Sequence, residues 1–243
     1  RNYGDEMSVT KVIVKSSNIG TARIAQEIGV ARQKEFLREL GMLEPTGFEL
    51  VEAATGRPLL PPNWSELSTM TISYGHGLST SPMHLAAGYA AIANGGYKVQ
   101  PTILKKHTLE KGPRVFTEQA SKASLAMLRK VVTEGTASFG EVEGYAVAGK
   151  TGTADKPRRA GGGYYEDKVI ATFASVFPAH NPKYVLIVTL DEPVDTVGDE
   201  PRRTAGWTAV PVAAEMIRRV APLLGLRPTV EPQSTMDIKL TSN

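Results

Sequence analysis

The spacing of apolar residues changes along the chain and divides it into a helical part and a sheet part. Before about residue 140, apolar residues recur at helical intervals in segments that open on a capping residue or close on a glycine. Serine and threonine at Ser8, Ser81 and Thr117 are expected to cap helix starts, because their hydroxyls accept a hydrogen bond from the first turn. We therefore expect helices over residues 8–14, 19–28, 31–40, 82–92 and 117–134.

The last third of the chain changes to short runs rich in valine, alanine, phenylalanine and tyrosine. The runs at 145–153, 169–177 and 184–190 are separated by glycine, proline and asparagine, which predicts three strands. The second and third runs are close enough in sequence to be antiparallel neighbours. The segment 155–168 contains a triple glycine and is expected to be a mobile loop, and a final helix is expected over 210–224.

Two stretches between the expected helices have no regular period. Residues 44–68 are rich in proline, glycine and small polar groups, which predicts an irregular segment on the surface, and residues 97–116 resemble a hairpin.

These elements predict a mixed α+β fold in which an antiparallel sheet is flanked by helices. One domain is expected over 1–228, with a helical part at about 1–140 and the sheet and last helix at about 141–228. Residues 229–243 form a polar C-terminal tail that we expect to be frayed.

Composition excludes several classes of protein. The 243 residues contain no cysteine, so disulfides and thiolate zinc sites are excluded, and the four histidines lack the paired spacing of metal ligands. No metal or organic cofactor is expected. The net charge is +3, without the basic face and stacking aromatics of nucleic-acid binding. No apolar run is long enough for a membrane helix.

Two short motifs carry candidate chemistry. Lys150–Thr153 reads Lys-Thr-Gly-Thr, and Ser16–Asn18 reads Ser-Ser-Asn. Lys-Thr-Gly and Ser-x-Asn are two of the three signatures of the serine enzymes that penicillin acylates. Taken singly, each is a weak signal, because Ser and Asn also favour helix starts and Lys-Thr-Gly also suits a turn.

The same lysine lies in a second pattern. Residues 144–151 fit G-x-x-x-x-G-K-[ST], the loop that cradles phosphates in nucleotide hydrolases. That loop follows a buried strand and opens a helix at its lysine. Here the preceding residues 139–143 are charged, residues 145–148 are themselves strand-like, and 152–157 resist helix formation. The context disfavours a P-loop nucleotide hydrolase, which remains an alternative.

An ordered set of blocks joins the two motifs. In that order the chain resembles the class B penicillin-binding proteins, especially the division-associated peptidoglycan transpeptidases, from about residue 8 to residue 224. The blocks are 15–20 (Lys-Ser-Ser-Asn-Ile-Gly), 74–78 (Tyr-Gly-His-Gly-Leu), 93–96 (Ala-Asn-Gly-Gly), 132–137 (Val-Thr-Glu-Gly-Thr-Ala) and 148–154 (Ala-Gly-Lys-Thr-Gly-Thr-Ala).

The resemblance implies catalytic roles for three residues. Ser16 would relay protons between the catalytic lysine and the reacting amine. Asn18 would donate an amide hydrogen bond to the substrate backbone and help to hold that lysine. Lys150 would complete the proton network and favour an anionic substrate.

It also implies how the strand of Lys150 binds substrate. The hydroxyls of Thr151 and Thr153 would hold the terminal carboxylate, and the Thr153 N–H would form half of an oxyanion hole. Gly152 has no side chain, so a peptide can approach and add to the strand edge.

The third signature, Ser-x-x-Lys, occurs at Ser8–Lys11. This copy lies eight residues before Ser16, on the helix that leads into the triplet, so the two serines cannot easily face each other. Ser8 is better explained as a helix cap. The resemblance places the nucleophile helix upstream, so we expect a fold that is incomplete at its N-terminal side, with one unpaired sheet edge.

The function implied is a peptidoglycan D,D-transpeptidase domain that binds D-Ala-D-Ala stem peptides and β-lactams. The resemblance further implies other cell-division proteins as partners and a periplasmic location, tethered to the inner membrane by an upstream anchor. Alternatives within the superfamily are a β-lactamase, a D,D-carboxypeptidase and a penicillin sensor. A non-catalytic interaction module of the division complex is an alternative from a different class.

We predict that this polypeptide alone forms no stable acyl-enzyme, because neither Ser8 nor Ser16 is placed as an activated nucleophile beside a base. Incubation with a fluorescent penicillin and gel detection measures this. Stoichiometric labelling of the isolated chain would show that the interpretation of Ser8 is wrong.

Overall fold

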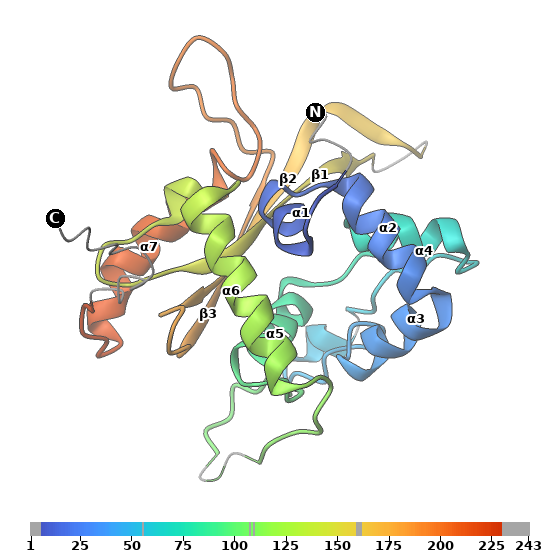
Figure 1. Ribbon diagram of the computed structural model, residues 1–243, viewed down its shortest axis with the longest axis horizontal. Coiled ribbons are helices and arrows are strands. Elements are labelled where there is room, and N and C mark those ends of the chain that lie inside the picture. Colours follow the sequence, from blue (N-terminus) through green and yellow to red (C-terminus); the bar gives the residue numbers. More distant parts are fainter. Residues whose placement is uncertain (1–5, 55, 107, 109, 159–161, 230–243) are drawn as a thin grey trace, which may run out of the picture.

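Helices surround a three-stranded antiparallel sheet in the computed structural model, which describes residues 6–54, 56–106, 108, 110–158 and 162–229 (Figure 1). The helical elements before the sheet are α1 (Val9–Lys15), α2 (Asn18–Ile28), α3 (Val30–Glu39), η1 (Val51–Ala54), α4 (Glu66–Ser73), α5 (Pro82–Ala93), α6 (Glu118–Glu134) and η2 (Ser138–Gly140). The strands β1 (Ala148–Pro157), β2 (Tyr164–Phe177) and β3 (Tyr184–Asp191) follow, and α7 (Ala209–Leu223) is the last helix. The mixed fold class predicted from the sequence is confirmed.

The sheet has the order β1-β2-β3, so β2 is paired on both sides. Gly149 pairs with Ser175 across β1 and β2, and Phe173 pairs with Val188 across β2 and β3. The C-terminal half of β2 is buried almost continuously because α5 and α7 both pack on β2 and β3. Among the described residues β1 and β3 are the outer strands, and each has one edge without a strand partner.

One cluster of buried apolar side chains joins the sheet to three helices. It draws Val14 from α1, Val131 from α6, Phe173 from β2, and Val210 and Ile217 from α7. The last four of these side chains are fully buried. Burial of apolar surface is the main favourable term in folding. The cluster therefore fixes α6 against the sheet, together with α1, which is distant from the sheet in sequence.

The helix starts follow the capping chemistry expected from the sequence. Ser8, Ser81 and Thr117 cap α1, α5 and α6, and each hydroxyl accepts a hydrogen bond from the backbone N–H three residues on. Pro82 occupies the first turn of α5, where its missing N–H costs nothing. Ser17 caps α2 in the same way. The predicted helices are therefore present, with ends within about two residues of those expected.

Three parts of the chain differ from the expectation. The stretch predicted to be irregular at 44–68 contains η1 and the start of α4, and Ser65 caps that helix. The hairpin-like region 97–116 contains one isolated bridge, Tyr97 to Arg114, in place of two strands. The predicted mobile loop at 155–168 is largely strand, because β1 and β2 pair as far as Pro157 and Tyr164.

Further expectations concern the membrane, metals and the tail. No described helix combines the length and hydropathy that a bilayer span requires. The described part of the chain also has no cluster of three or more histidine, aspartate or glutamate side chains arranged to hold a metal ion. Residues 230–243 of the expected tail lie outside the described residues, while the Thr229 N–H donates to the Gly144 carbonyl.

Gly149 and Gly152 on β1 give a matched test of this packing. A Cβ on Gly149 would lie 2.6 Å from the Ala174 carbonyl oxygen and 2.7 Å from the Phe173 ring, whereas a Cβ on Gly152 would meet nothing closer than 4.0 Å. We expect Gly149→Ala to lower the free energy of unfolding by about 1–3 kcal/mol. Gly152→Ala should change it by less than about 0.5 kcal/mol. Urea unfolding of both variants measures the difference, and equal effects would contradict the packing described.

Candidate active site

The Ser16–Asn18 triplet forms the corner between α1 and α2. Ser16 ends α1 in a left-handed conformation with φ 54° and ψ 52°, and its N–H donates to the Ile13 carbonyl. Ser17 is extended, and its hydroxyl accepts from the Gly20 N–H to cap α2. A left-handed residue with a Cβ costs about 1–2 kcal/mol. Such strain persists where the surrounding structure holds it, often at functional sites.

Two glycines allow the close packing that holds this corner. The Val14 carbonyl oxygen would lie 2.6 Å from a Cβ on Gly135, so α1 approaches the end of α6 at backbone distance. A Cβ on Gly20 would lie 2.6 Å from the Val12 side chain. The Lys15 ammonium also donates to the Glu134 carbonyl in the last turn of α6, at 3.3 Å. The hydroxyl of Ser16 is therefore carried by a packed corner and not by a free loop.

Strand β1 brings Lys150 to this corner. The Lys150 Nζ donates to the Ser16 Oγ at 2.9 Å and to the Thr151 carbonyl oxygen at 3.0 Å. These two side chains are 134 residues apart in sequence. The two motifs singled out in the sequence are therefore parts of one site.

Burial sets the protonation of Lys150. Desolvation lowers the pKa of the Lys150 ammonium to about 8, because its partners Ser16 and Thr151 offer neutral oxygens and no opposite charge. The ammonium form still dominates at pH 7. A small change in the site can therefore convert this lysine from a proton donor into a proton acceptor.

The two threonines after Lys150 are anchored by hydroxyl contacts that the sequence did not indicate. The Thr151 Oγ1 lies 2.7 Å from the Thr136 Oγ1, and the Thr153 Oγ1 accepts from the Ala205 N–H at 3.0 Å. Thr136 precedes η2, and Ala205 precedes α7. Thr136 lies in one of the blocks above, yet no pattern marks it as a partner of Thr151, because sheet register and helix packing create the contact.

Four members of the set are exposed, namely Ser16, Asn18, Gly152 and Thr153. Asn18 is the first residue of α2, directly after the corner, and its side chain is open to solvent. Gly152 is exposed on β1, whose outer edge has no strand partner among the described residues. Both are open to an incoming ligand, and their roles in binding stay predictions.

The two competing interpretations of the sequence have clear outcomes. Ser8 caps α1 and accepts from the Lys11 N–H at 3.2 Å, at the opposite end of the helix from Ser16. A seven-residue helix is about 10 Å long, so the two hydroxyls do not meet. The P-loop alternative is wrong, because Lys150 lies inside a strand and no helix begins there.

Comparison with known proteins identifies the family. The family model described as "Penicillin binding protein transpeptidase domain" matches residues 1–217. The chain belongs to this family. Its relatives place it with the class B penicillin-binding proteins, as the ordered motifs predicted.

Two curated relatives show how far the match extends. The probable peptidoglycan D,D-transpeptidase FtsI of Caulobacter vibrioides is 34% identical over 235 residues, which cover 93% of this chain and 39% of that protein. Penicillin-binding protein PbpB of Mycobacterium tuberculosis is 34% identical over 231 residues, which cover 87% of this chain and 34% of that protein. The transpeptidase chain thus spans well under half the length of these relatives.

Solved structures agree with the fold. The apo transpeptidase domain of Burkholderia pseudomallei penicillin-binding protein 3 superposes with a TM-score of 0.81 at 35% identity, covering 93% of this chain and 67% of that one. Penicillin-binding protein 3 of Mycobacterium tuberculosis, complexed with ampicillin, gives a TM-score of 0.79 at 31% identity, covering 93% and 53%. The penicillin-binding fold is therefore shown independently of the motifs.

We predict that Lys150 titrates well below an ordinary lysine, which has a pKa of about 10.4. Burial disfavours the ammonium, so the proton should leave with a midpoint near 8. NMR of the lysine side chains between pH 6 and pH 11 measures this, and the signal that disappears in Lys150→Arg identifies the residue. A midpoint above about 10 for that signal would contradict the desolvated site.

Proposed function

We propose that this chain is the part of a peptidoglycan D,D-transpeptidase that handles the proton and binds the peptide during acyl transfer. The observation that carries the proposal is the 2.9 Å contact from the Lys150 ammonium to the Ser16 hydroxyl, in a member of the penicillin-binding family. The reaction breaks the bond between the two terminal D-alanines of a stem peptide. The acyl group then passes through a serine ester to an amine on a neighbouring strand.

Ser16 is proposed to carry the proton in this reaction. Its oxygen accepts from Lys150, so its own O–H is free to donate away from the lysine. When the tetrahedral intermediate collapses, the departing D-alanine nitrogen takes this proton, and Lys150 replaces it. The transfer reverses when the acceptor amine attacks the ester. Positioned proton transfer of this kind accelerates reactions about 10²–10⁴-fold.

Lys150 suits this task because of its charge and its shifted pKa. With a pKa of about 8, it holds a proton at pH 7 but releases it at small cost. In the ammonium form it also places positive charge beside Ser16, which favours the carboxylate of the stem peptide. The geometry therefore supports a single lysine serving as proton reservoir and as electrostatic anchor.

The outer edge of β1 is proposed to bind the peptide. An extended stem peptide can add to the strand at Gly152, where no side chain obstructs its backbone. The Thr153 hydroxyl accepts from Ala205, so its proton remains available to donate to the terminal carboxylate, and Thr151 supplies a second hydroxyl. Asn18 would donate its amide to the peptide from the corner of α1 and α2, and the Thr153 N–H would receive the oxyanion.

The attacking serine is proposed to be supplied by residues other than Ser8 and Ser16. Ser8 is held as a helix cap. Ser16 does lie beside a base, Lys150, but it belongs to the Ser-x-Asn signature, and the mechanism above uses its hydroxyl as the proton relay. We therefore propose that the Ser-x-Asn and Lys-Thr-Gly signatures of this chain act together with a nucleophile from the third signature, Ser-x-x-Lys.

β-Lactams are proposed to enter the same site as mimics of the D-Ala-D-Ala terminus. The similar Mycobacterium tuberculosis protein has been solved in complexes with ampicillin and with aztreonam. We also propose a periplasmic location, a membrane anchor outside the described helices and partners among the cell-division proteins. The division link rests on the names of relatives, which include FtsI and a stage V sporulation protein.

The adjacent residues Ser16 and Ser17 allow a sharp test of the mechanism. In the protein at the length its gene encodes, Ser16→Ala should slow acylation by a fluorescent penicillin about 10²–10⁴-fold, because the proton relay is lost. Ser17→Ala should leave the rate within about threefold while lowering stability by about 1 kcal/mol, since it removes only the cap of α2. Stopped labelling reactions give the rates, and thermal unfolding gives the stabilities.

The outcomes of this experiment separate the possibilities. A normal rate in Ser16→Ala would remove Ser16 from the mechanism. Equal losses in both variants would mean that the corner matters only as structure. A second assay gives the protein a D-Ala-D-Ala peptide and an added D-amino acid. Hydrolysis of the peptide to the form without its last D-alanine, with no transfer to the D-amino acid, would point to a carboxypeptidase in place of a transpeptidase.

A further inference from the structure

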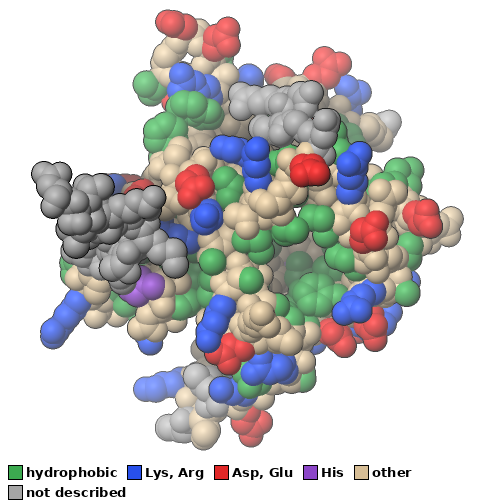
Figure 2. All heavy atoms as spheres, in the orientation of Figure 1, with side chains coloured by type: hydrophobic (Ala, Val, Ile, Leu, Met, Phe, Trp, Pro, Cys, Tyr) green, Lys and Arg blue, Asp and Glu red, His purple; other side chains and the backbone are tan. Residues whose placement is uncertain are grey.

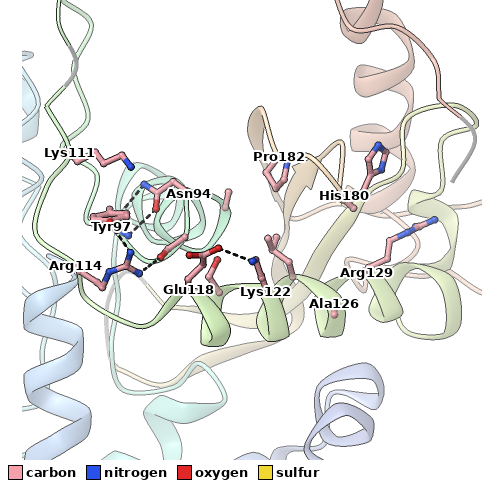
Figure 3. Close-up of a pocket in the computed structure, with 15 residues that line it drawn as sticks. Asn94, Tyr97, Lys111, Arg114, Glu118, Lys122, Ala126, Arg129, His180 and Pro182 are labelled. Carbon is pink, nitrogen blue, oxygen red and sulfur yellow. Dashed lines mark hydrogen bonds and ion pairs between the residues drawn. The ribbon is translucent and has the colours of Figure 1, made fainter. Parts of the chain in front are cut away.

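A cavity lies along α6, on the side of the Tyr97 loop and away from Ser16. It has a volume of about 640 Å³ and is bounded by residues 118–129 of α6, the end of α5 and the turn between β2 and β3. Figure 3 shows Asn94, Tyr97, Lys111 and Arg114 grouped at one end, Glu118, Lys122, Ala126 and Arg129 along α6, and Pro182 and His180 across from the helix. Ligand sites commonly have volumes of about 300–1,000 Å³. The cavity is therefore large enough to bind a peptide segment.

Cations gather at one end of this cavity around Tyr97. The Lys111 Nζ lies 4.8 Å from the centre of the Tyr97 ring, and the Arg114 Cζ lies 4.2 Å from it. Arg114 also donates to the Tyr97 hydroxyl at 2.7 Å and to the Gly95 carbonyl at 2.7 Å. The Asn94 side chain accepts a hydrogen bond from the Tyr97 N–H and donates one to the Tyr97 carbonyl. The positive groups are thus fixed in place by a clamped loop (Figure 3).

The carboxylates do not balance these cations. Of the residues that line the cavity, Glu118 alone is acidic, and it pairs with Lys122 at 2.7 Å. The hydrogen bond and charge of Lys122 lower the pKa of Glu118, and Arg114 and Lys111 add to the effect. Lys111, Arg114 and Lys122 therefore face one ionised carboxylate. Figure 2 shows Lys and Arg side chains, with Asp and Glu side chains among them, over this end of α6 and the loop beside it.

The rest of the cavity is less polar and continues along α6. Leu125, Ala126 and Pro182 line its middle, and Arg129 and His180 lie at the far end. Residues 122 and 129 are two helical turns apart, about 10 Å, a distance that an extended peptide covers in about three residues. An apolar side chain flanked by carboxylates fits this order of groups.

We propose that this cavity binds an extended acidic segment of a partner protein, with carboxylates at the cationic end and an apolar side chain against Leu125 and Pro182. The excess of positive charge selects for acidic residues and speeds encounter. The Tyr97 ring already carries two cations, so it is not a free platform for the base stacking that single-stranded nucleic acids use. A small inorganic anion would leave the apolar middle empty.

Fluorescence anisotropy of the full chain with a fluorescein-labelled peptide Asp-Glu-Leu-Asp-Glu tests the proposal. Binding should exceed that of the uncharged peptide Asn-Gln-Leu-Asn-Gln by about tenfold or more and should weaken as salt rises. The double variant Lys111→Glu with Lys122→Glu should weaken binding of the acidic peptide about tenfold. Glu118→Gln should strengthen it about two- to threefold, because the competing carboxylate is gone.

Helix α6 supplies matched controls. Lys130 and Glu134 form a second exposed ion pair at the same i,i+4 spacing, outside the cavity. Lys130→Glu and Glu134→Gln should leave peptide affinity unchanged within about twofold. Misfolding can only weaken binding. Weaker binding in the Lys111→Glu, Lys122→Glu double variant together with stronger binding in Glu118→Gln therefore cannot both arise from misfolding. Equal affinity for the two peptides, or no response to the variants, would overturn the proposal. So would displacement of the labelled acidic peptide by a muramyl pentapeptide but not by the unlabelled acidic peptide.

Discussion

The contact between Lys150 and Ser16 is the constraint on which the rest of the site depends. It joins a strand to a helix corner that lies 134 residues earlier, at a donor–acceptor distance of 2.9 Å. A hydrogen bond loses most of its strength when its geometry drifts. Both partners must therefore be held independently, the lysine by the register of β1 on β2 and the serine by the packing of α1 on α6.

Much of this arrangement could be predicted from the sequence because its causes are local. Capping hydroxyls and terminal glycines predicted the helices, and short runs rich in valine, alanine, phenylalanine and tyrosine predicted the strands. The family resemblance then linked Ser16, Asn18 and Lys150 before any geometry was known, and the structure joined two of the three directly. Asn18 lies two residues after Ser16, at the start of α2, and its role stays a prediction.

What the sequence could not predict depends on contacts between distant segments. The partners of Thr151 and Thr153 are Thr136 and Ala205, and no sequence pattern identifies either residue as a hydrogen-bond partner. The left-handed backbone conformation of Ser16 could not be predicted from the sequence either, since serine does not favour that conformation. The strands extend into 155–168 because β1 and β2 pair as far as Pro157 and Tyr164, while Gly162 and Gly163 stay outside the strands with positive φ.

Helix α6 contributes to both the proposed acidic-peptide cavity and the surroundings of the Ser16–Lys150 contact. Its last turn meets Lys15 beside Ser16, while residues 118–129 line the cavity. At the far end of the cavity, Arg129 pairs with Glu141 and donates to the Val147 carbonyl at 3.0 Å, three residues before Lys150. A ligand carboxylate that drew Arg129 from Val147 would loosen the start of β1. Energetic coupling between the two sites requires that an arrangement with Arg129 away from Val147 be populated.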